Sequence, residues 1–277
     1  MATISVLMSV YHSEKAEYLN RSLQSVWDDQ SLKPNQIVLI EDGPLGEELH
    51  KVIDKWKERL QDVFCIVKNE KNIGLTKSLN KGIQYITSEL IARADSDDIS
   101  MPTRFALQEK FLAEHPDVDI LGGAMQEFNE DNDCLNVRRY PSTHEQARKY
   151  IMKASPLAHP SVMMRKKIFD EGLRYNEEYR TSQDVALWFD ALNAGYHIAN
   201  LDDIILHFRQ NSSVFKRRGR AKAWNEFKIY IKGIYRKKGL FTFYYVYPLS
   251  RLLFRLMPAR LIELVYKSNM RNKMLQS

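Results

Sequence analysis

Residues 90–98 read Leu-Ile-Ala-Arg-Ala-Asp-Ser-Asp-Asp, an apolar run that ends in three carboxylates. The apolar part predicts a buried strand over 90–94. Carboxylates this close repel one another unless a cation or hydrogen-bond donors lie beside them. The cluster therefore predicts a site for a hard divalent ion. The alternative is a helix N-cap, because Asp98 and Ser100 precede a plausible helix that begins near Pro102.

Strand-like and helix-like segments alternate up to about residue 100. Apolar runs predict strands over 3–10, 36–40, 63–67 and 90–94. Apolar residues at helical spacing predict helices over 16–27, 47–60 and 75–86. This alternation favours an α/β fold with a mostly parallel sheet and helices on both faces, which binds ligands at the carboxyl ends of its strands.

Polar side chains follow three of the predicted strands, in 11–14, 41–42 and 95–98. Because parallel strands end at the same edge of a sheet, we expect these side chains to lie close together. After residue 100 the alternation weakens. There the sequence predicts a polar excursion over 126–150, a strand over 162–164 and an amphipathic helix over 185–192.

Composition and cysteine usage indicate a globular protein from a reducing compartment. The chain of 277 residues is 44% apolar, which is enough for one large domain or a domain with an appendage. Cys65 and Cys134 lack metal-ligand spacing, and Cys65 lies in an apolar run. The first residues resemble a core strand and lack the basic segment of a secretion signal. We therefore expect a cytoplasmic protein.

Charge is distributed unevenly along the chain. Residues 216–277 hold 16 of the 41 Lys and Arg but only two of the 35 Asp and Glu, a net charge of +14. Since the whole chain carries +6, residues 1–215 carry −8. The sequence therefore predicts a main domain over 1–215 and a basic tail over 216–277 with different partners.

The basic tail predicts helices that lie on a membrane. Trp224, Phe227, Ile231 and Ile234 recur at helical spacing, while the basic residues fall elsewhere. The uncharged stretch 239–250 is too short to cross a bilayer, which takes about 20 apolar residues. Basic side chains beside an apolar surface favour an anionic membrane surface. The alternative is a helix packed on the main domain with a solvated basic face.

Four motifs in order carry a family resemblance. They are VLMSVYHSE from residue 6, VLIEDGP from 38, NEKNIGLTKSLNKGI from 69 and ARADSDDISMPTRF from 92. Over about residues 3–215 the chain resembles family 2 glycosyltransferases, in particular the exopolysaccharide and O-antigen branch with amylovoran-type enzymes. The resemblance implies a GT-A fold, which is a Rossmann-like mixed sheet, here followed by a C-terminal helical appendage.

The resemblance also implies a nucleotide site at the first three motifs. Val10 and Tyr11 would line the nucleotide pocket, and Asp42 would contact the base. Asn72 and Lys77 of the third motif would approach the nucleotide or its phosphates. The alternatives are that Asp42 caps a turn and that Asn72 only shapes one.

In the fourth motif the resemblance implies metal binding. Arg93 matches the family, Asp95 would lie near the ribose and also ligate the metal, and Asp97 would be the principal ligand. The ion would be Mn²⁺ or Mg²⁺, which bridges the two phosphates of a nucleotide sugar and neutralises charge on the leaving diphosphate.

Asp184 corresponds to the family's catalytic base, which deprotonates the acceptor hydroxyl. Gln183 replaces the first carboxylate of the commoner Glu-Asp pair, so Asp184 is the only acid of that pair. Trp188, one turn later, would supply apolar surface that raises the pKa of the base, and would contact the acceptor. A single base opposite a leaving group implies inversion at the anomeric carbon. The alternative is an Asp that caps a helix.

Two further segments resemble less specific parts of the family. His159 would bind the acceptor sugar, with a buried structural histidine as the alternative. Arg209 would contact the diphosphate. Asn211 stands where a metal-binding histidine is frequent, and His207, four residues earlier, would substitute for it.

The expected activity is transfer of a hexose, galactose or glucose, from a UDP-sugar to a polyprenyl-diphosphate-linked glycan at the inner face of the membrane. One rival is a nucleic-acid-binding protein that uses the basic tail. The negative main domain disfavours it, so no nucleic-acid partner is expected. A nucleotidyltransferase would need a Gly-rich basic loop, which 9–15 lack. A catalytically inactive sugar-binding module is disfavoured by the presence of Asp97 and Asp184.

Overall fold

The computed structural model describes residues 1–131, 133–210 and 220–256. Contacts within the chain divide it into two compact units, residues 1–211 and 212–277. The boundary that the charge distribution predicts, between residues 215 and 216, lies outside the described residues and stays a prediction.

The first half of the N-terminal unit is built on four parallel strands. They are β1 (Ile4–Val10), β2 (Gln36–Glu41), β3 (Phe64–Lys68) and β4 (Leu90–Asp95), in the spatial order β3-β2-β1-β4. All four predicted strands are confirmed to within one residue at each end. Each is almost wholly apolar because helices cover both faces of the sheet.

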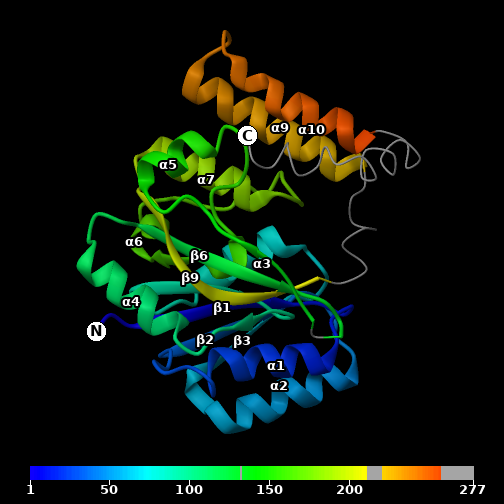
Figure 1. Ribbon diagram of the computed structural model, residues 1–277. Coiled ribbons are helices and arrows are strands. Elements are labelled where there is room, and N and C mark those ends of the chain that lie inside the picture. The colour runs from blue at the N-terminus through cyan, green and yellow to red at the C-terminus, as the bar shows by residue number, and fades with distance from the viewer. Residues whose placement is uncertain (132, 211–219, 257–277) are drawn as a thin grey trace. The chain divides into compact units, whose positions relative to one another are not determined.

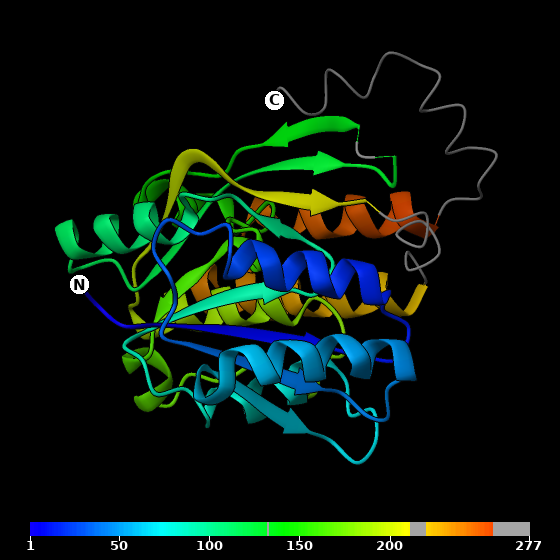
Figure 2. The same cartoon turned by 90° about the horizontal axis from the view of Figure 1, so that it is seen from below.

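Helices α1 (Ala16–Val26) and α2 (Glu47–Leu60) lie side by side on one face, and α3 (Leu75–Ile83) lies on the other (Figures 1 and 2). Alternate residues of β1 supply the two faces. On the α1 and α2 face one buried cluster joins Ile4, Val6, Met8, Leu19, Leu23, Ile53 and Trp56. On the other face a Cβ atom at Gly82 would lie 2.6 Å from Ile40 Cδ1 and 2.7 Å from Leu7 Cδ1. The close approach of α3 therefore requires glycine at that position.

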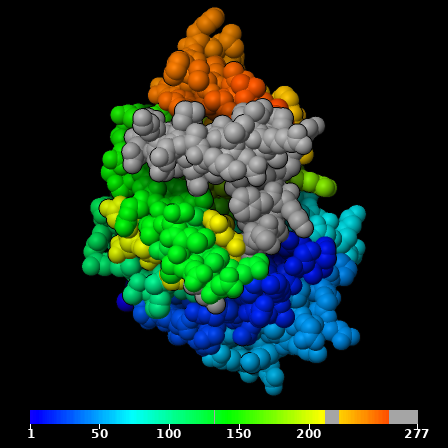
Figure 3. Space-filling view, turned by 45° about the vertical axis from the view of Figure 1, so that its right-hand side comes forward, coloured from blue at the N-terminus to red at the C-terminus, as the bar shows by residue number. Residues whose placement is uncertain are grey.

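The second half of the unit makes the sheet mixed. Its strands are β5 (Ile99–Ser100), β6 (Ile120–Phe128), β7 (Cys134–Arg138), β8 (Met163–Arg165) and β9 (Ile198–Arg209). The order continues as β4-β8-β6-β9-β5, with β7 beside β6. Strand β8 runs antiparallel to β4 and β6, whereas β6 and β9 are parallel. The mixed sheet that the family resemblance implies is thus confirmed. Figure 3 shows the two halves, blue and green, adjoining in one surface.

Helices connect these later strands. They are α4 (Arg104–Glu114), α5 (His144–Tyr150), α6 (Lys167–Asp170) and α7 (Gln183–Ala194), with the short 3₁₀ segment η2 (His159–Ser161). In the first half, the 3₁₀ segment η1 (Gln61–Val63) joins α2 to β3. The polar excursion predicted over 126–150 is wrong in part, because this range holds the end of β6, all of β7 and all of α5. The side chains of Thr143 and Gln146 form a capping box that begins α5.

The described part of the C-terminal unit is a helical hairpin. Helix α9 (Arg220–Lys238) leads through η3 (Phe243–Tyr245) into α10 (Val246–Leu256), and the two long helices lie side by side (Figure 1). Glu226 of α9 pairs with Arg251, at 2.8 Å, and with Arg255 of α10. Among the described residues, every helix is too short or too polar to cross a membrane.

Candidate active site

The ends of β1, β2 and β4 meet at one edge of the sheet. The register pairs Val10 with Glu41 and Ser9 with Asp95, so the polar residues that follow these strands are neighbours. The Ser96 hydroxyl donates to Glu14 Oε2 at 2.5 Å, which joins the end of β4 to the loop after β1. The expected meeting of three strand ends is confirmed.

Three carboxylates form the centre of this edge. One oxygen each of Asp95, Asp97 and Asp98 lies within 4.8 Å of the other two. Asp98 is 2% exposed, and its Oδ1 accepts a hydrogen bond from the Arg209 amide at 2.8 Å. Its Oδ2 is buried and has no hydrogen-bond partner among the described residues. Burial, with the charges of Asp97 and Asp95, raises the pKa of Asp98 well above its usual value.

This donor set fits a hard divalent cation. Three carboxylates supply the oxygen ligands that Mg²⁺ and Mn²⁺ prefer, and a buried oxygen without a partner gains most from an added cation. The alternative of a helix N-cap is wrong, because α4 begins after Thr103. Among the described residues, the cluster comprises these three aspartates. The His207 ring lies 6.2 Å from that of Phe128, and the role of His207 as a further metal ligand stays a prediction.

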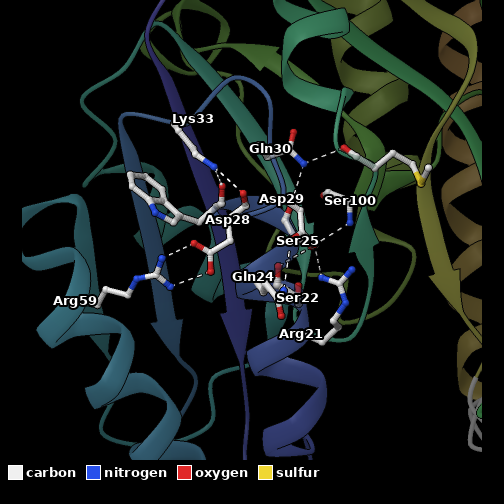
Figure 4. Close-up of polar contacts among 12 residues, drawn as sticks. Arg21, Ser22, Gln24, Ser25, Asp28, Asp29, Gln30, Lys33, Arg59 and Ser100 are labelled. Atoms are coloured by element: carbon white, nitrogen blue, oxygen red, sulfur yellow. Dashed lines mark hydrogen bonds and ion pairs between the residues drawn. The ribbon is translucent and has the colours of Figure 1, made fainter.

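The loop that follows the cluster is fixed to α1. The Ser22 hydroxyl donates to the Asp95 carbonyl at 2.8 Å. Ser25 Oγ accepts from the Ser100 amide at 3.0 Å, and Gln30 donates to the carbonyl of Met101 at 2.8 Å (Figure 4). These contacts bury small polar side chains of α1 against the loop and hold the carboxylates in place.

Two arginines flank the cluster. Arg93, which is 2% exposed, donates to Asp95 Oδ1. Burial opposes the charge of Arg93, but the Asp95 carboxylate more than offsets it, so the pKa of Arg93 is raised. Arg209 donates from Nε to the Asp97 carbonyl at 3.0 Å, and its guanidinium lies over the rings of Tyr18 and Phe128. Both predicted arginines are therefore brought to the acidic edge.

Asp42 organises the loop between β3 and α3. Its carboxylate accepts from the amides of Ile73, at 2.8 Å, and Gly74, at 3.0 Å. Asn72 donates to the Asp42 carbonyl at 3.2 Å. Both turn-forming alternatives are thus realised in the structure. The roles of Asp42 and Asn72 toward a nucleotide stay predictions, as does that of Lys77, whose side chain is exposed on α3.

Val10 and Tyr11 differ in their access to a ligand. The Val10 side chain is completely buried in the core, and its role beside a nucleotide stays a prediction. Its carbonyl accepts from the Asp42 amide at 2.8 Å, which links the ends of β1 and β2. Tyr11 is half-buried, and its ring packs edge-on against His12 at 5.5 Å between centroids.

Asp184 lies half-buried in the first turn of α7. The N-cap residue is Ser182, whose backbone adopts a left-handed conformation with φ of 59°. Burial and the charge of Asp184 both contribute to raising the pKa of Tyr140, to about 12. The buried Tyr175 feels the charges of Asp184 and Asp95 together.

His159 and Trp188 lie in the protein interior. His159 Nε2 is 2.8 Å from the Tyr175 hydroxyl, and burial holds the pKa of His159 well below its usual value. Trp188 is completely buried, with its ring 6.0 Å from that of His159. The burial of His159 matches the alternative of a buried structural histidine, and the acceptor-binding roles of His159 and Trp188 stay predictions.

The sequence analysis did not identify two residues that support the site. Arg104 is completely buried and donates to Ser100 Oγ at 2.9 Å and to the Arg93 carbonyl at 2.7 Å. Burial and the nearby Arg93 charge lower the pKa of Arg104 to about 9. One turn later, Gln108 donates to the carbonyls of Leu121 and Ser161. In the sequence, Arg104 and Gln108 are two polar residues four positions apart, a spacing that places them on one face of a helix.

The sequence of the N-terminal unit matches a known family. Residues 5–173 fit the family model described as glycosyl transferase family 2. The chain belongs to this family. Over 267 residues this family 2 glycosyltransferase is 34% identical to the amylovoran biosynthesis glycosyltransferase AmsE of Erwinia amylovora, which covers 96% of this chain and 98% of that protein. It is 31% identical over 270 residues, 96% of each chain, to an Escherichia coli enzyme named UDP-Gal:alpha-D-GlcNAc-diphosphoundecaprenol beta-1,3-galactosyltransferase.

Solved structures show the same fold. Staphylococcus aureus TarS 1–349 in complex with UDP-GlcNAc superposes with a TM-score of 0.61 at 17% identity, over 92% of this chain and 82% of that one. A mannosyltransferase from Pyrobaculum calidifontis, in complex with GDP-Man and Mn²⁺, superposes with a TM-score of 0.64 at 13% identity, over 92% and 70%. The predicted GT-A fold is confirmed, and the chain is a glycosyltransferase.

Proposed function

We propose that this glycosyltransferase moves a hexose, galactose or glucose, from a UDP-sugar to a sugar hydroxyl of a polyprenyl-diphosphate-linked glycan, with inversion. The observation that carries the proposal is the carboxylate cluster of Asp95, Asp97 and Asp98 at the carboxyl ends of parallel strands, with one buried oxygen left unpartnered. Ligands of α/β sheets bind at this edge.

On the donor side, Asp97 and Asp98 would hold a divalent ion, with Asp95 beside them. The ion would supply charge neutralisation to the leaving diphosphate. Arg93 orients the Asp95 carboxylate through their direct contact. Arg209 presents a guanidinium next to the Asp97 carbonyl, where it would bind phosphate oxygens. Asp42 fixes the loop 69–74 that would surround the nucleotide.

On the acceptor side, Asp184 would act as the general base. The acceptor hydroxyl gives its proton to the Asp184 carboxylate while its oxygen forms a bond to the anomeric carbon. The bond from that carbon to the diphosphate oxygen breaks, and UDP leaves with the electron pair. Since attack and departure occur on opposite faces, an α-linked donor gives a β-linked product.

The relatives support the substrate class. The Escherichia coli relative is named for UDP-Gal and for an acceptor linked to diphosphoundecaprenol, and the Erwinia amylovora relative for amylovoran biosynthesis. TarS has been solved with UDP-GlcNAc. We extend these properties to this chain as exopolysaccharide or O-antigen synthesis. A lipid-linked acceptor places the enzyme at the cytoplasmic face of the cell membrane, with the basic tail in contact with anionic lipid.

Two isosteric variants test the assignment. Asp184→Asn removes the proton acceptor, so sugar transfer should fall by about a thousandfold or more while UDP binding with Mn²⁺, measured by calorimetry, stays within about twofold. Asp97→Asn should instead weaken the Mn²⁺-dependent part of UDP binding at least about tenfold. The exposed helical variant Asp54→Asn is the matched control for loss of one negative charge. Loss of UDP binding in Asp184→Asn would contradict its role as base.

A further inference from the structure

The C-terminal unit exposes apolar residues that the sequence pattern did not single out. Of the four residues whose spacing predicts an apolar membrane face, Trp224 is largely exposed, whereas Ile234 is completely buried. Phe227 borders the small space between α9 and α10, where it faces Arg251 and Leu252. The four predicted residues therefore do not form one exposed apolar face on α9.

The connection between the two helices carries the most exposed apolar side chains. Leu240 is 65% exposed, Phe241 95% and Phe243 75%. Each of these side chains is mostly exposed, although burying one side chain of this size is worth about 2 kcal/mol. Their clustering within four residues at the tip of a hairpin distinguishes them from the scattered exposed apolar residues of ordinary surfaces.

Helix α10 extends this surface. Its exposed residues are Val246, Leu249, Ser250, Leu253 and Phe254, and none of them is charged. Its two arginines lie on the inner side instead, where both pair with Glu226 of α9. Four of the five exposed residues are apolar, so this face of α10 matches an apolar environment better than water.

Cationic and aromatic side chains accompany the apolar surface on α9. Lys228 and Lys232 are exposed, one turn apart, and Trp224 and Tyr235 are exposed at positions on the same side of the helix. Trp and Tyr favour the interface between lipid and water, and lysines favour anionic head groups. The combination matches the chemistry of a bilayer surface.

We propose that an apolar edge, formed by Leu240, Phe241, Phe243, Val246, Leu249 and Leu253, inserts into the interfacial region of an anionic lipid bilayer. This inference rests on the proposed lipid-linked acceptor for its biological setting, and it names the residues that make the contact. Charge favours a lipid bilayer over other partners for this edge. The tail carries a net charge of +14, which attracts anionic lipid and repels a second copy of the same tail. Nucleic acid would leave the uncharged face of α10 without a partner.

The test uses the full chain and sucrose-loaded vesicles of phosphatidylcholine with roughly one third phosphatidylglycerol. Phe241→Ser with Phe243→Ser should weaken partition to these vesicles at least about tenfold, because two exposed rings lose their apolar burial. The control is Leu135→Ser with Val137→Ser, which removes two exposed apolar side chains from β7 of the N-terminal unit and should leave partition unchanged. Lys228→Glu with Lys232→Glu should remove the preference for phosphatidylglycerol over pure phosphatidylcholine.

Equal partition of the Phe241/Phe243 variant and wild type would overturn the proposal. So would sedimentation showing that the wild type dimerises through these two residues while failing to bind vesicles, or retention on DNA without binding to vesicles. Turnover of nucleotide sugar with a water-soluble acceptor analogue is measured in parallel. Loss of vesicle binding with unchanged turnover supports the apolar edge, whereas absent turnover with intact vesicle binding counts against the proposed function alone.

Discussion

The surroundings of the Asp98 carboxylate favour a bound metal ion over the metal-free state. Burial and two neighbouring aspartates raise the pKa of Asp98, so its ionised form costs folding free energy at neutral pH. The pKa of Asp98 is higher in the folded state than in the unfolded state. The free-energy cost of its charge therefore appears as the pH rises through the folded-state pKa. A bound cation would remove this cost.

Asp98→Asn should therefore stabilise the metal-free protein and weaken its response to metal. We expect Tm without metal to rise by roughly 2–4 °C, which corresponds to about 1 kcal/mol for a chain of this size. The rise in Tm that Mn²⁺ gives the wild type should largely disappear. Differential scanning calorimetry with and without Mn²⁺ measures both effects, with Asp54→Asn as the control. A variant that keeps the full response to Mn²⁺ would exclude Asp98 from the site.

His159 gives a separate prediction about pH. Its folded pKa is lowered by burial, so the unfolded chain takes up a proton below about pH 6.5 that the folded protein does not. Stability from this group is present above pH 6.5 and falls by up to about 1.4 kcal/mol per pH unit below it. His159→Gln should flatten the slope of unfolding free energy between pH 6.5 and 5 relative to wild type, measured by urea unfolding. An equal slope in the two proteins would show that His159 does not titrate on unfolding.

Residue identities predicted part of the site because their chemistry is local. Three aspartates within four residues predict a cation site from charge alone, and the structure brings them together. Tyr175 could not be found this way, because its position depends on Asn80, 95 residues earlier, which bonds both its amide and its carbonyl. The buried positions of His159 and Trp188 likewise depend on long-range packing.

At the scale of elements, the turn after β2 and the loop between β3 and α3 depend on backbone conformations that only glycine adopts easily. Gly43 has φ of +91°, and a Cβ atom there would lie 2.5 Å from the Asn72 amide nitrogen. Gly74 has φ of +87° with open space around its Cα atom, and Gly46 has ordinary φ and open space. Gly46 and Gly74 are both helix N-caps, so they form a matched pair.

Alanine substitutions at Gly43, Gly46 and Gly74 should distinguish the cost of a disfavoured backbone φ from the cost of a steric clash at the added Cβ atom. Gly46→Ala should cost less than about 1 kcal/mol of unfolding free energy, because alanine is a poorer N-cap than glycine. Gly74→Ala should cost about 1 kcal/mol more, because L-residues disfavour its φ. Gly43→Ala should cost the most, above about 2 kcal/mol, and should also weaken UDP binding because the loop 69–74 shifts. Urea unfolding gives the order, and equal costs at Gly43 and Gly46 would refute this description of the loop.

The strands of the first half were all predictable from the sequence, whereas in the second half few elements were: the strand predicted over 162–164 and the helix predicted over 185–192 match β8 and α7. Strands β1 to β4 are buried on both faces and read as continuous apolar runs between helices. Strand β6 contains Gly122 and Gly123, where Cβ atoms would collide with Asn200 and Ile205, and β9 contains Asp202 and Asp203. Such residues lower strand propensity, so only pairing across the sheet identifies these strands.

At the scale of the whole molecule, the two units carry opposite net charge. The negative N-terminal part holds the carboxylate edge, and the basic tail holds the exposed apolar residues. The sequence predicted this division of charge, since charge is additive along the chain. Which apolar residues stay exposed depends on how the helices pack, so the structure was needed to identify them.

The most direct test of the central claim is a donor assay with the intact chain. A panel of UDP- and GDP-sugars is incubated with a lipid-diphosphate GlcNAc or GalNAc acceptor analogue, with Mn²⁺ or with a chelator, using wild type and Asp184→Asn. The proposal predicts that one UDP-hexose is consumed only with Mn²⁺, that the product is β-linked, and that Asp184→Asn forms none of it. Consumption that is independent of metal, an α-linked product, or full activity of Asp184→Asn would contradict it.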